Sequence, residues 1–231
     1  MVEPKREPKF AEYYQVYIWQ LPVRFFHWTN ATCLLVLSVT GYLMANPIAL
    51  QSSAEASYRY IFGQIRFVHF AFAYIFTVNF AARVYWGFVG NRFSKWKNFI
   101  THTPRQIREA WKVLCLDLLQ ICKLPLSSIG INGLAGIIYP LVYLIILFQI
   151  VTGFGLYAAM SRSRFPKLFT WVVPLMGGDV VVRQWHHVMT WVLLVFTAFH
   201  IYLSWYHDYL EGRGTMSSMI GGWKFIEKEV R

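Results

Sequence analysis

Four of the seven histidines lie within long apolar segments, where an ionisable side chain is costly and usually has a function. They are His27, His69, His186 and His200. An imidazole in such a place can ligate a metal, relay protons or form a hydrogen bond with a neighbouring helix. For any one histidine alone, the hydrogen bond is the simpler interpretation. The spacing of the four together favours metal ligation.

His186 and His200 are fourteen residues apart, close to four turns of an α-helix, so they share one helix face. At 1.5 Å per residue they differ in depth by about 21 Å. His187 does not share this face, because it lies roughly 140° around the helix from His200. One helix can therefore present His186 and His200 to two separate ligands.

Antiparallel threading predicts the partners of these two histidines. His27 stands where its apolar segment begins and His200 near the end of its own, so the two share one level. His69 and His186 both stand near the start of their segments, at the opposite level. The sequence therefore predicts two bis-histidine sites, His27 with His200 and His69 with His186.

Haem suits this arrangement better than zinc. Two pairs about 21 Å apart cannot close one tetrahedral zinc site, whereas a haem needs only two axial ligands. Cys33, Cys115 and Cys122 form neither a metal-ligand pair nor a CxxCH attachment motif. We therefore expect two haems of the b type, held without a covalent link to cysteine.

Three more residues are candidates for contact with a cofactor. Gly41 follows His27 by fourteen residues, so it faces the other level, where a missing side chain lets a porphyrin approach the backbone. Arg83 follows His69 by the same step and can pair with a haem propionate. Arg24, just before the first segment, can hold the other propionate. The alternative for both arginines is snorkelling to lipid headgroups.

Four apolar segments must position these side chains. Each is long enough to cross a bilayer, which takes roughly 20 mainly apolar residues. They span about 25–45, 66–88, 134–158 and 185–206. The chain is 56% hydrophobic and 14% charged, outside the usual range of soluble domains. No small-residue cleavage site follows the first segment, so we expect a retained helix. The fold class is all-α integral membrane, a four-transmembrane-helix bundle in a single membrane domain, 1–231.

An amphipathic helix is predicted between the second and third spans, at about 103–123. Its apolar stripe is formed by Ile107, Trp111, Leu114, Leu118 and Ile121. Basic residues lie off this stripe, which predicts a helix in the cytoplasmic interface of the membrane. A plain connector is its simplest role.

The net charge of +11 follows the predicted topology. Lysines and arginines concentrate in the N-terminal segment, the 89–133 loop and the C-terminal segment, which places both termini in the cytoplasm. Arg162, Arg164 and Lys167 in the opposite loop run against this rule. We expect lipid, and no nucleic acid, as the partner of the charged flanks, with the chain in the cytoplasmic (inner) membrane of a bacterium.

The first and third spans share a short similar sequence. Val39-Thr40-Gly41-Tyr42 is repeated as Val151-Thr152-Gly153-Phe154. The match is too short to argue an internal duplication.

Several stretches together carry a resemblance to a known family. They are Pro22-Val-Arg-Phe-Phe-His27-Trp28, Ile65-Arg-Phe-Val-His69-Phe, Arg83-Val-Tyr-Trp-Gly-Phe-Val-Gly-Asn-Arg92-Phe-Ser, Trp185-His186, His200 and the tail Ser217-Ser-Met-Ile-Gly-Gly-Trp-Lys224. From about residue 15 to its C-terminus the chain resembles the b-type cytochrome subunit of membrane-bound nickel–iron hydrogenases. Gamma subunits of formate dehydrogenases and other di-haem cytochromes b share the histidine pattern. The stretch from Gly90 to Ser94 and the tail favour hydrogenase.

The resemblance implies that the four histidines are haem ligands. It further implies a subunit that anchors the small and large subunits of a periplasmic hydrogenase and passes electrons from the small subunit's iron–sulfur relay through two haems b to quinone. Such a chain is the electron-transfer subunit of a hydrogen:quinone oxidoreductase complex. Asn132 resembles an asparagine near quinone in the formate dehydrogenase subunits, and a helix cap is its alternative role.

Two other functions stay open at this point. The nearer is the gamma subunit of a formate dehydrogenase or a thiosulfate reductase, with the same haems and another partner. The more remote is a haem-free membrane scaffold or transporter whose histidines relay protons.

Overall fold

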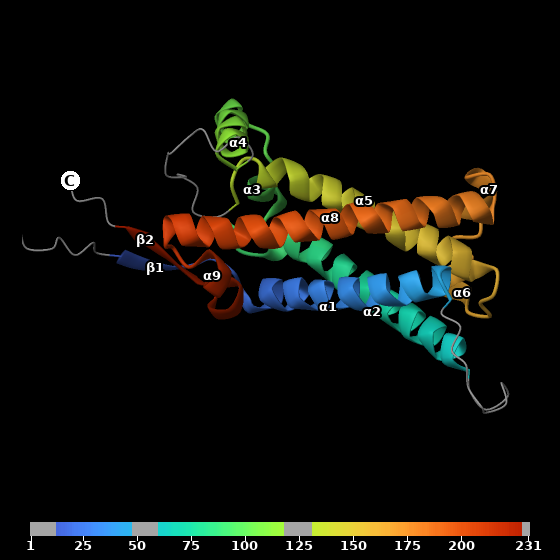
Figure 1. Cartoon of the computed structure of the whole chain (residues 1–231). Coiled ribbons are helices and arrows are strands. Elements are labelled where there is room, and N and C mark those ends of the chain that lie inside the picture. The colour runs from blue at the N-terminus through green and yellow to red at the C-terminus, as the bar shows by residue number, and fades with distance from the viewer. Residues whose placement is uncertain (1–12, 48–59, 118–130, 228–231) are drawn as a thin grey trace, which may run out of the picture.

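The computed structural model describes residues 13–47, 60–117 and 131–227, and four long helices dominate it (Figure 1). These helices are α1 (Leu21–Ala45), α2 (Ile61–Val89), α5 (Ala135–Ala158) and α8 (Asp179–Glu211). Among the described residues, these four are long and apolar enough to cross a membrane. The predicted bundle of four long apolar helices is therefore confirmed.

Three of the four helices extend past the spans predicted from hydropathy. α1 begins at Leu21 instead of about 25, α2 at Ile61 instead of about 66, and α8 at Asp179 instead of about 185. Hydropathy marks only the part of a helix that is apolar enough for hydrocarbon, so it misses the polar ends. In α1, Pro22 also favours the early start, because proline in the first turn has no N–H to leave unpaired.

The helices pack as two pairs. α1 packs mainly against α2, and α5 mainly against α8. A small core joins the pairs and contains the buried side chains of Cys33, Phe76, Ile150 and Phe154. Side chains from all four helices also line one shared cavity. The small core therefore joins the two helix pairs at one place, and the cavity separates them at another.

The two described ends of the chain meet at one end of the bundle (Figure 1). There β1 (Tyr13–Tyr17) and β2 (Trp223–Glu227) form an antiparallel two-stranded sheet, with Tyr17 opposite Trp223. We call this the terminal end. The opposite end carries α6 (Arg164–Lys167) and α7 (Val172–Leu175), and we call it the loop end.

The segment before β2 folds back onto the start of α1. α9 (Thr215–Gly221) is followed by its C-cap residue, Gly222. The φ of Gly222 is 90°, an angle that residues with a side chain rarely adopt. A Cβ at Gly222 would also lie 2.6 Å from Cε2 of Tyr17. The carbonyl of Gly222 accepts hydrogen bonds from the backbone N–H groups of Ile18 and Trp19. This turn therefore needs glycine both for its backbone angle and for close packing.

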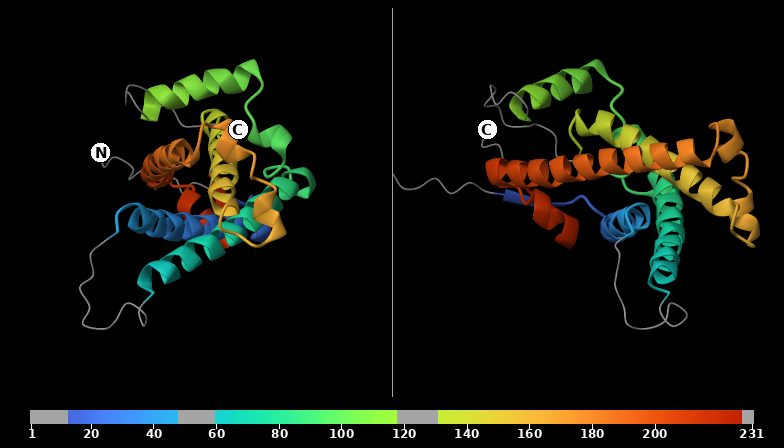
Figure 2. Two further views of the ribbon diagram at one scale, coloured as in Figure 1. Left: turned by 90° about the vertical axis from the view of Figure 1, so that its right-hand side faces the viewer. Right: turned by 45° about the vertical axis from the view of Figure 1, so that its right-hand side comes forward.

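Two short helices follow α2, namely α3 (Trp96–Phe99) and α4 (Pro104–Asp117), and α4 lies outside the four-helix bundle (Figure 2). A capping box starts α4, because Gln106 Oε1 accepts the Thr103 N–H at 3.0 Å while Thr103 Oγ1 accepts the Gln106 N–H at 3.3 Å. Ala110 and Val113 are buried, whereas Ile107 and Trp111 are exposed. The exposed apolar side chains agree with the predicted stripe, although Leu118 and Ile121 lie outside the described residues. A position in the membrane interface stays a prediction.

Candidate functional site

The structure brings the four membrane histidines together in the two predicted pairs. His27 and His200, from α1 and α8, have ring centroids 6.1 Å apart. A metal bound to one nitrogen of each ring, with bonds of about 2 Å, separates the centroids by roughly 6 Å. The centroid distance of the pair at the terminal end is therefore compatible with one shared metal ion.

His69 and His186 line the same cavity, which lies between all four long helices and has a volume of about 700 Å³. This volume is typical of pockets that bind small molecules or cofactors, and the lining is mostly apolar. His187 also lines the cavity, but its side chain is exposed, whereas that of His186 is half-buried. The pair at the loop end thus faces a space suited to a large apolar cofactor.

Each histidine of the loop-end pair contacts a threonine on the adjacent helix. Nδ1 of His69 lies 2.8 Å from Oγ1 of Thr40. Nδ1 of His186 lies 2.8 Å from Oγ1 of Thr152. These threonines belong to the repeated Val-Thr-Gly sequence, a signal that is visible in the sequence but has no function assigned to it there.

Gly41 lies at the level predicted for it, beside the loop-end pair. It lines the cavity, and a Cβ there would lie 3.4 Å from Cε1 of His69. Gly153 has the equivalent place on α5, where a Cβ would lie 3.2 Å from Cε1 of His186. A larger residue at either position would enter the space in front of a histidine.

Arg83 is buried, with a relative exposure of 6%, and so does not snorkel to a surface. Its guanidinium lies over the rings of Phe99, 5.2 Å from the centroid, and Trp96, at 5.8 Å. Nη1 of Arg83 is buried and has no hydrogen-bond partner among the described residues. Phe99 stacks on Tyr139, whose ring contacts His200. The buried guanidinium of Arg83 is therefore separated from His200 by the rings of Phe99 and Tyr139. An anionic group placed there could accept a hydrogen bond from Nη1 of Arg83.

Arg24 lies inside the first turn of α1. The position predicted from the sequence is just before the helix. Its Nη1 donates a hydrogen bond to the carbonyl of Ile220, and its buried Nε has no partner among the described residues. Beside it, Trp28 Nε1 donates to the carbonyl of Met219 at 3.0 Å. Arg24 and Trp28 thus attach the C-terminal segment to the helix that carries His27.

Asn132 caps the start of α5. Its Oδ1 accepts the backbone N–H of Ala135 at 2.8 Å, and its own carbonyl accepts the N–H of Gly136 at 3.0 Å. The structure therefore supports the capping alternative for this residue.

Two arginines at the cavity are absent from the predicted site. Arg66 precedes His69 by three residues and Arg183 precedes His186 by three, so each lies one turn nearer the loop end. Arg183 also forms an exposed ion pair with Asp179, at 3.1 Å. The shared Arg-x-x-His spacing is the sequence signal that would find both.

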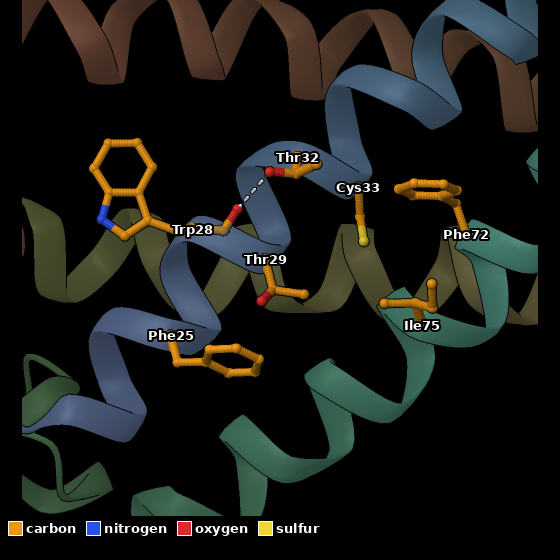
Figure 3. Close-up of a pocket in the computed structure, with 7 residues that line it drawn as sticks. All are labelled: Phe25, Trp28, Thr29, Thr32, Cys33, Phe72 and Ile75. Carbon is orange, nitrogen blue, oxygen red and sulfur yellow. Dashed lines mark hydrogen bonds between the residues drawn. The ribbon is translucent and has the colours of Figure 1, made fainter.

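A second hollow lies between α1 and α2, on the surface of the bundle (Figure 3). Its volume is about 360 Å³, and its lining includes Phe25, Trp28, Cys33, Phe72 and Ile75. No histidine lines it. This groove is therefore separate from both histidine pairs.

Four long apolar helices bring the histidines together in two pairs, one of which lines an apolar cavity. The comparisons with known proteins give the class and the family of the chain. The profile of the family described as prokaryotic cytochrome b561 matches residues 18–222. This chain belongs to that family, so it is an integral membrane cytochrome of the b type whose cofactor is haem b.

Curated relatives are similar over most of their length. A probable Ni/Fe-hydrogenase B-type cytochrome subunit of Azotobacter chroococcum is 36% identical over 220 residues, which cover 93% of this chain and 90% of the relative. The protein of the same name from Cupriavidus necator is 34% identical, covering 90% and 86%. The probable Ni/Fe-hydrogenase 1 B-type cytochrome subunit of Escherichia coli is 32% identical, covering 90% of each.

Proposed function

We propose that this chain is the b-type cytochrome subunit of a membrane-bound Ni/Fe hydrogenase and carries electrons through two haems b to quinone. The names of the relatives, which are hydrogenase cytochrome subunits, support this partner. The observation that carries the two-haem proposal is the grouping of the four membrane histidines into two pairs at different levels of α8. His27 with His200 is the proposed ligand set of one haem, and His69 with His186 that of the other.

The proposed topology sets which haem meets which partner. The distribution of basic residues supports a cytoplasmic terminal end. The haem of His69 and His186 is then the outer haem, near the periplasmic hydrogenase subunits, and the haem of His27 and His200 is the inner haem. Because α8 carries a ligand of each, its length spaces the two centres along one rigid element.

When bound, the haems supply the one-electron chemistry that links hydrogenase and quinone. The protein's part is to hold and tune them. The four histidines would hold the two haems, and the mostly apolar cavity would exclude water from the haem that His69 and His186 hold. Gly41 and Gly153 leave room in front of the outer ligands.

Cationic side chains at both levels are suited to the haem propionates. Arg83, with its buried unpaired Nη1, is the proposed partner at the inner haem, and Nε of Arg24 is a second donor at the same end. Arg66 and Arg183 are the proposed partners at the outer haem, since both line its cavity.

Quinone is proposed to bind near the inner haem at the terminal end. Asn132 lies at the start of α5, at that end. Since its Oδ1 caps the helix, any contact with quinone would fall to its amide nitrogen.

Purification from the native membrane tests the proposed partner. The subunits that co-purify with a tagged chain are identified by mass spectrometry, and a reduced-minus-oxidised spectrum is recorded with hydrogen as reductant. We expect the small and large subunits of a Ni/Fe hydrogenase and a b-type α band that hydrogen reduces. Recovery of formate dehydrogenase or thiosulfate reductase subunits instead would contradict the partner, and absence of any haem spectrum would overturn the proposal.

A further inference from the structure

The first half of the loop-end pair is a contact between α1 and α2. Thr40 Oγ1 lies 2.8 Å from Nδ1 of His69, and it also donates a hydrogen bond to the carbonyl of Val36 at 2.7 Å. The next residue, Gly41, lies against the same imidazole. Thr40 and Gly41 of α1 therefore both contact the imidazole of His69.

The second half has the same construction on α5 and α8. Thr152 Oγ1 lies 2.8 Å from Nδ1 of His186 and donates to the carbonyl of Phe148 at 2.7 Å. Gly153 again lies against the imidazole. Two helix pairs thus present two histidines to one cavity through the same set of contacts.

The hydrogen-bond donors and acceptors around each histidine favour one tautomer of its imidazole. A threonine hydroxyl has one proton, and here a backbone carbonyl takes it. In that arrangement the hydroxyl accepts a bond from Nδ1, which assigns the imidazole proton to Nδ1. The lone pair is left on Nε2, the nitrogen that is free to bind iron.

The bond to the backbone carbonyl is not the distinguishing feature. Thr77 and Thr197 also donate to carbonyls four residues earlier, at 2.7 Å, as threonines in helices commonly do. What sets Thr40 and Thr152 apart is the histidine contact, repeated at the same distance on both sides of one cavity.

We propose that Thr40 and Thr152 are positioning residues of the outer haem, holding Nε2 of both ligands toward the iron and lowering the haem's midpoint potential. This inference rests on the proposed function, because it needs the outer haem. A histidine whose Nδ1–H is bonded to an acceptor is a more basic ligand, which stabilises ferric over ferrous iron.

Among the residues that the structure describes, the inner pair lacks this arrangement. The contact of Tyr139 Oη with Nδ1 of His200 is 3.5 Å, long for a hydrogen bond. The proposed contacts therefore lower the potential of the outer haem and not that of the inner one, which favours electron movement from the outer haem to the inner one.

Redox titration of the purified, haem-loaded full-length protein tests the inference. The spectral component of the outer haem is identified as the one that is lost in His69→Ala. In Thr40→Val and Thr152→Val, which keep the branched shape but lose the hydroxyl, we expect the potential of this component to rise, and to rise further in the double variant. The inner component should not move. Thr32→Val is the matched control, because Thr32 donates to the carbonyl of Trp28 in the same way but lines only the hollow that is separate from both histidine pairs, and it should leave both potentials unchanged.

Thr40→Ser completes the test, since serine restores the hydroxyl. A return to the wild-type potential, or outer haem retained in Thr40→Ser when Thr40→Val loses it, supports the inference. Unchanged potentials in valine variants that keep both haems would overturn it, as would equal shifts or equal haem loss in the serine and valine variants. A wild-type protein without a second haem would instead overturn the proposed function.

Discussion

His27 and His200 face each other across α1 and α8 with ring centroids 6.1 Å apart. If both are ligands of the inner haem, His27→Ala and His200→Ala should have the same effect. Each should lose one haem per chain, about half of the total, and keep the other, as measured by the pyridine haemochrome assay. His102→Ala is the control, because His102 is exposed outside the long helices and should not affect haem content. Different haem components lost in the two variants would contradict the pairing.

His186 and His187 are neighbours with different predicted roles. Nδ1 of His186 is held by Thr152, while the side chain of His187 is exposed. His186→Ala should therefore remove the outer haem, and His187→Ala should leave both. Haem content with low-temperature spectra of each variant checks this. Loss of a haem in His187→Ala alone would mean that the helix phase of α8 is misassigned.

Arg83 places a buried positive charge near the proposed inner haem. A cation stabilises the reduced, more negative state of a haem, so Arg83→Leu should lower the inner haem's potential. A shift of roughly 60 mV corresponds to a tenfold change in a one-electron equilibrium, and we expect that order of magnitude. Arg105→Leu, in the exposed first turn of α4, is the control. An inner potential that does not move, or an equal shift at both haems, would count against this role.

Trp28 and Arg24 attach the C-terminal segment to α1 through the carbonyls of Met219 and Ile220. A hydrogen bond contributes about 1 kcal/mol, so Trp28→Phe should speed amide exchange in residues 215–227 by roughly fivefold. Hydrogen–deuterium exchange in nanodiscs measures this. Trp111→Phe, an exposed tryptophan of α4, should leave the segment unchanged. The same exchange rates in both variants would show that the contact does not hold the segment.

Much of the fold follows from local sequence pattern. Four apolar runs predict the four helices, and the fourteen-residue step between His186 and His200, with antiparallel threading, predicts both histidine pairs. The capping role of Asn132 is also an alternative that its position before a helix makes visible. These features depend on one helix at a time or on the order of helices across a membrane.

Features that depend on contact between distant segments could not be predicted in this way. The sheet of β1 and β2 joins the two ends of the chain, and the bond from Arg24 to Ile220 depends on how the tail folds back. The contact of Thr40 with His69 depends on the rotation and register of α1 against α2, which periodicity within one helix does not fix. The repeated Val-Thr-Gly sequence hints at equivalent roles, but its meaning comes only from the structure.

The number of haems per chain tests the account most directly. The measurement is the pyridine haemochrome content of purified protein divided by its chain concentration from amino-acid analysis, repeated on His69→Ala and His27→Ala. We predict two haems b in the wild type, one in each single variant and none in the double variant. One haem in the wild type, or a double variant that still holds a haem, would contradict the two bis-histidine sites.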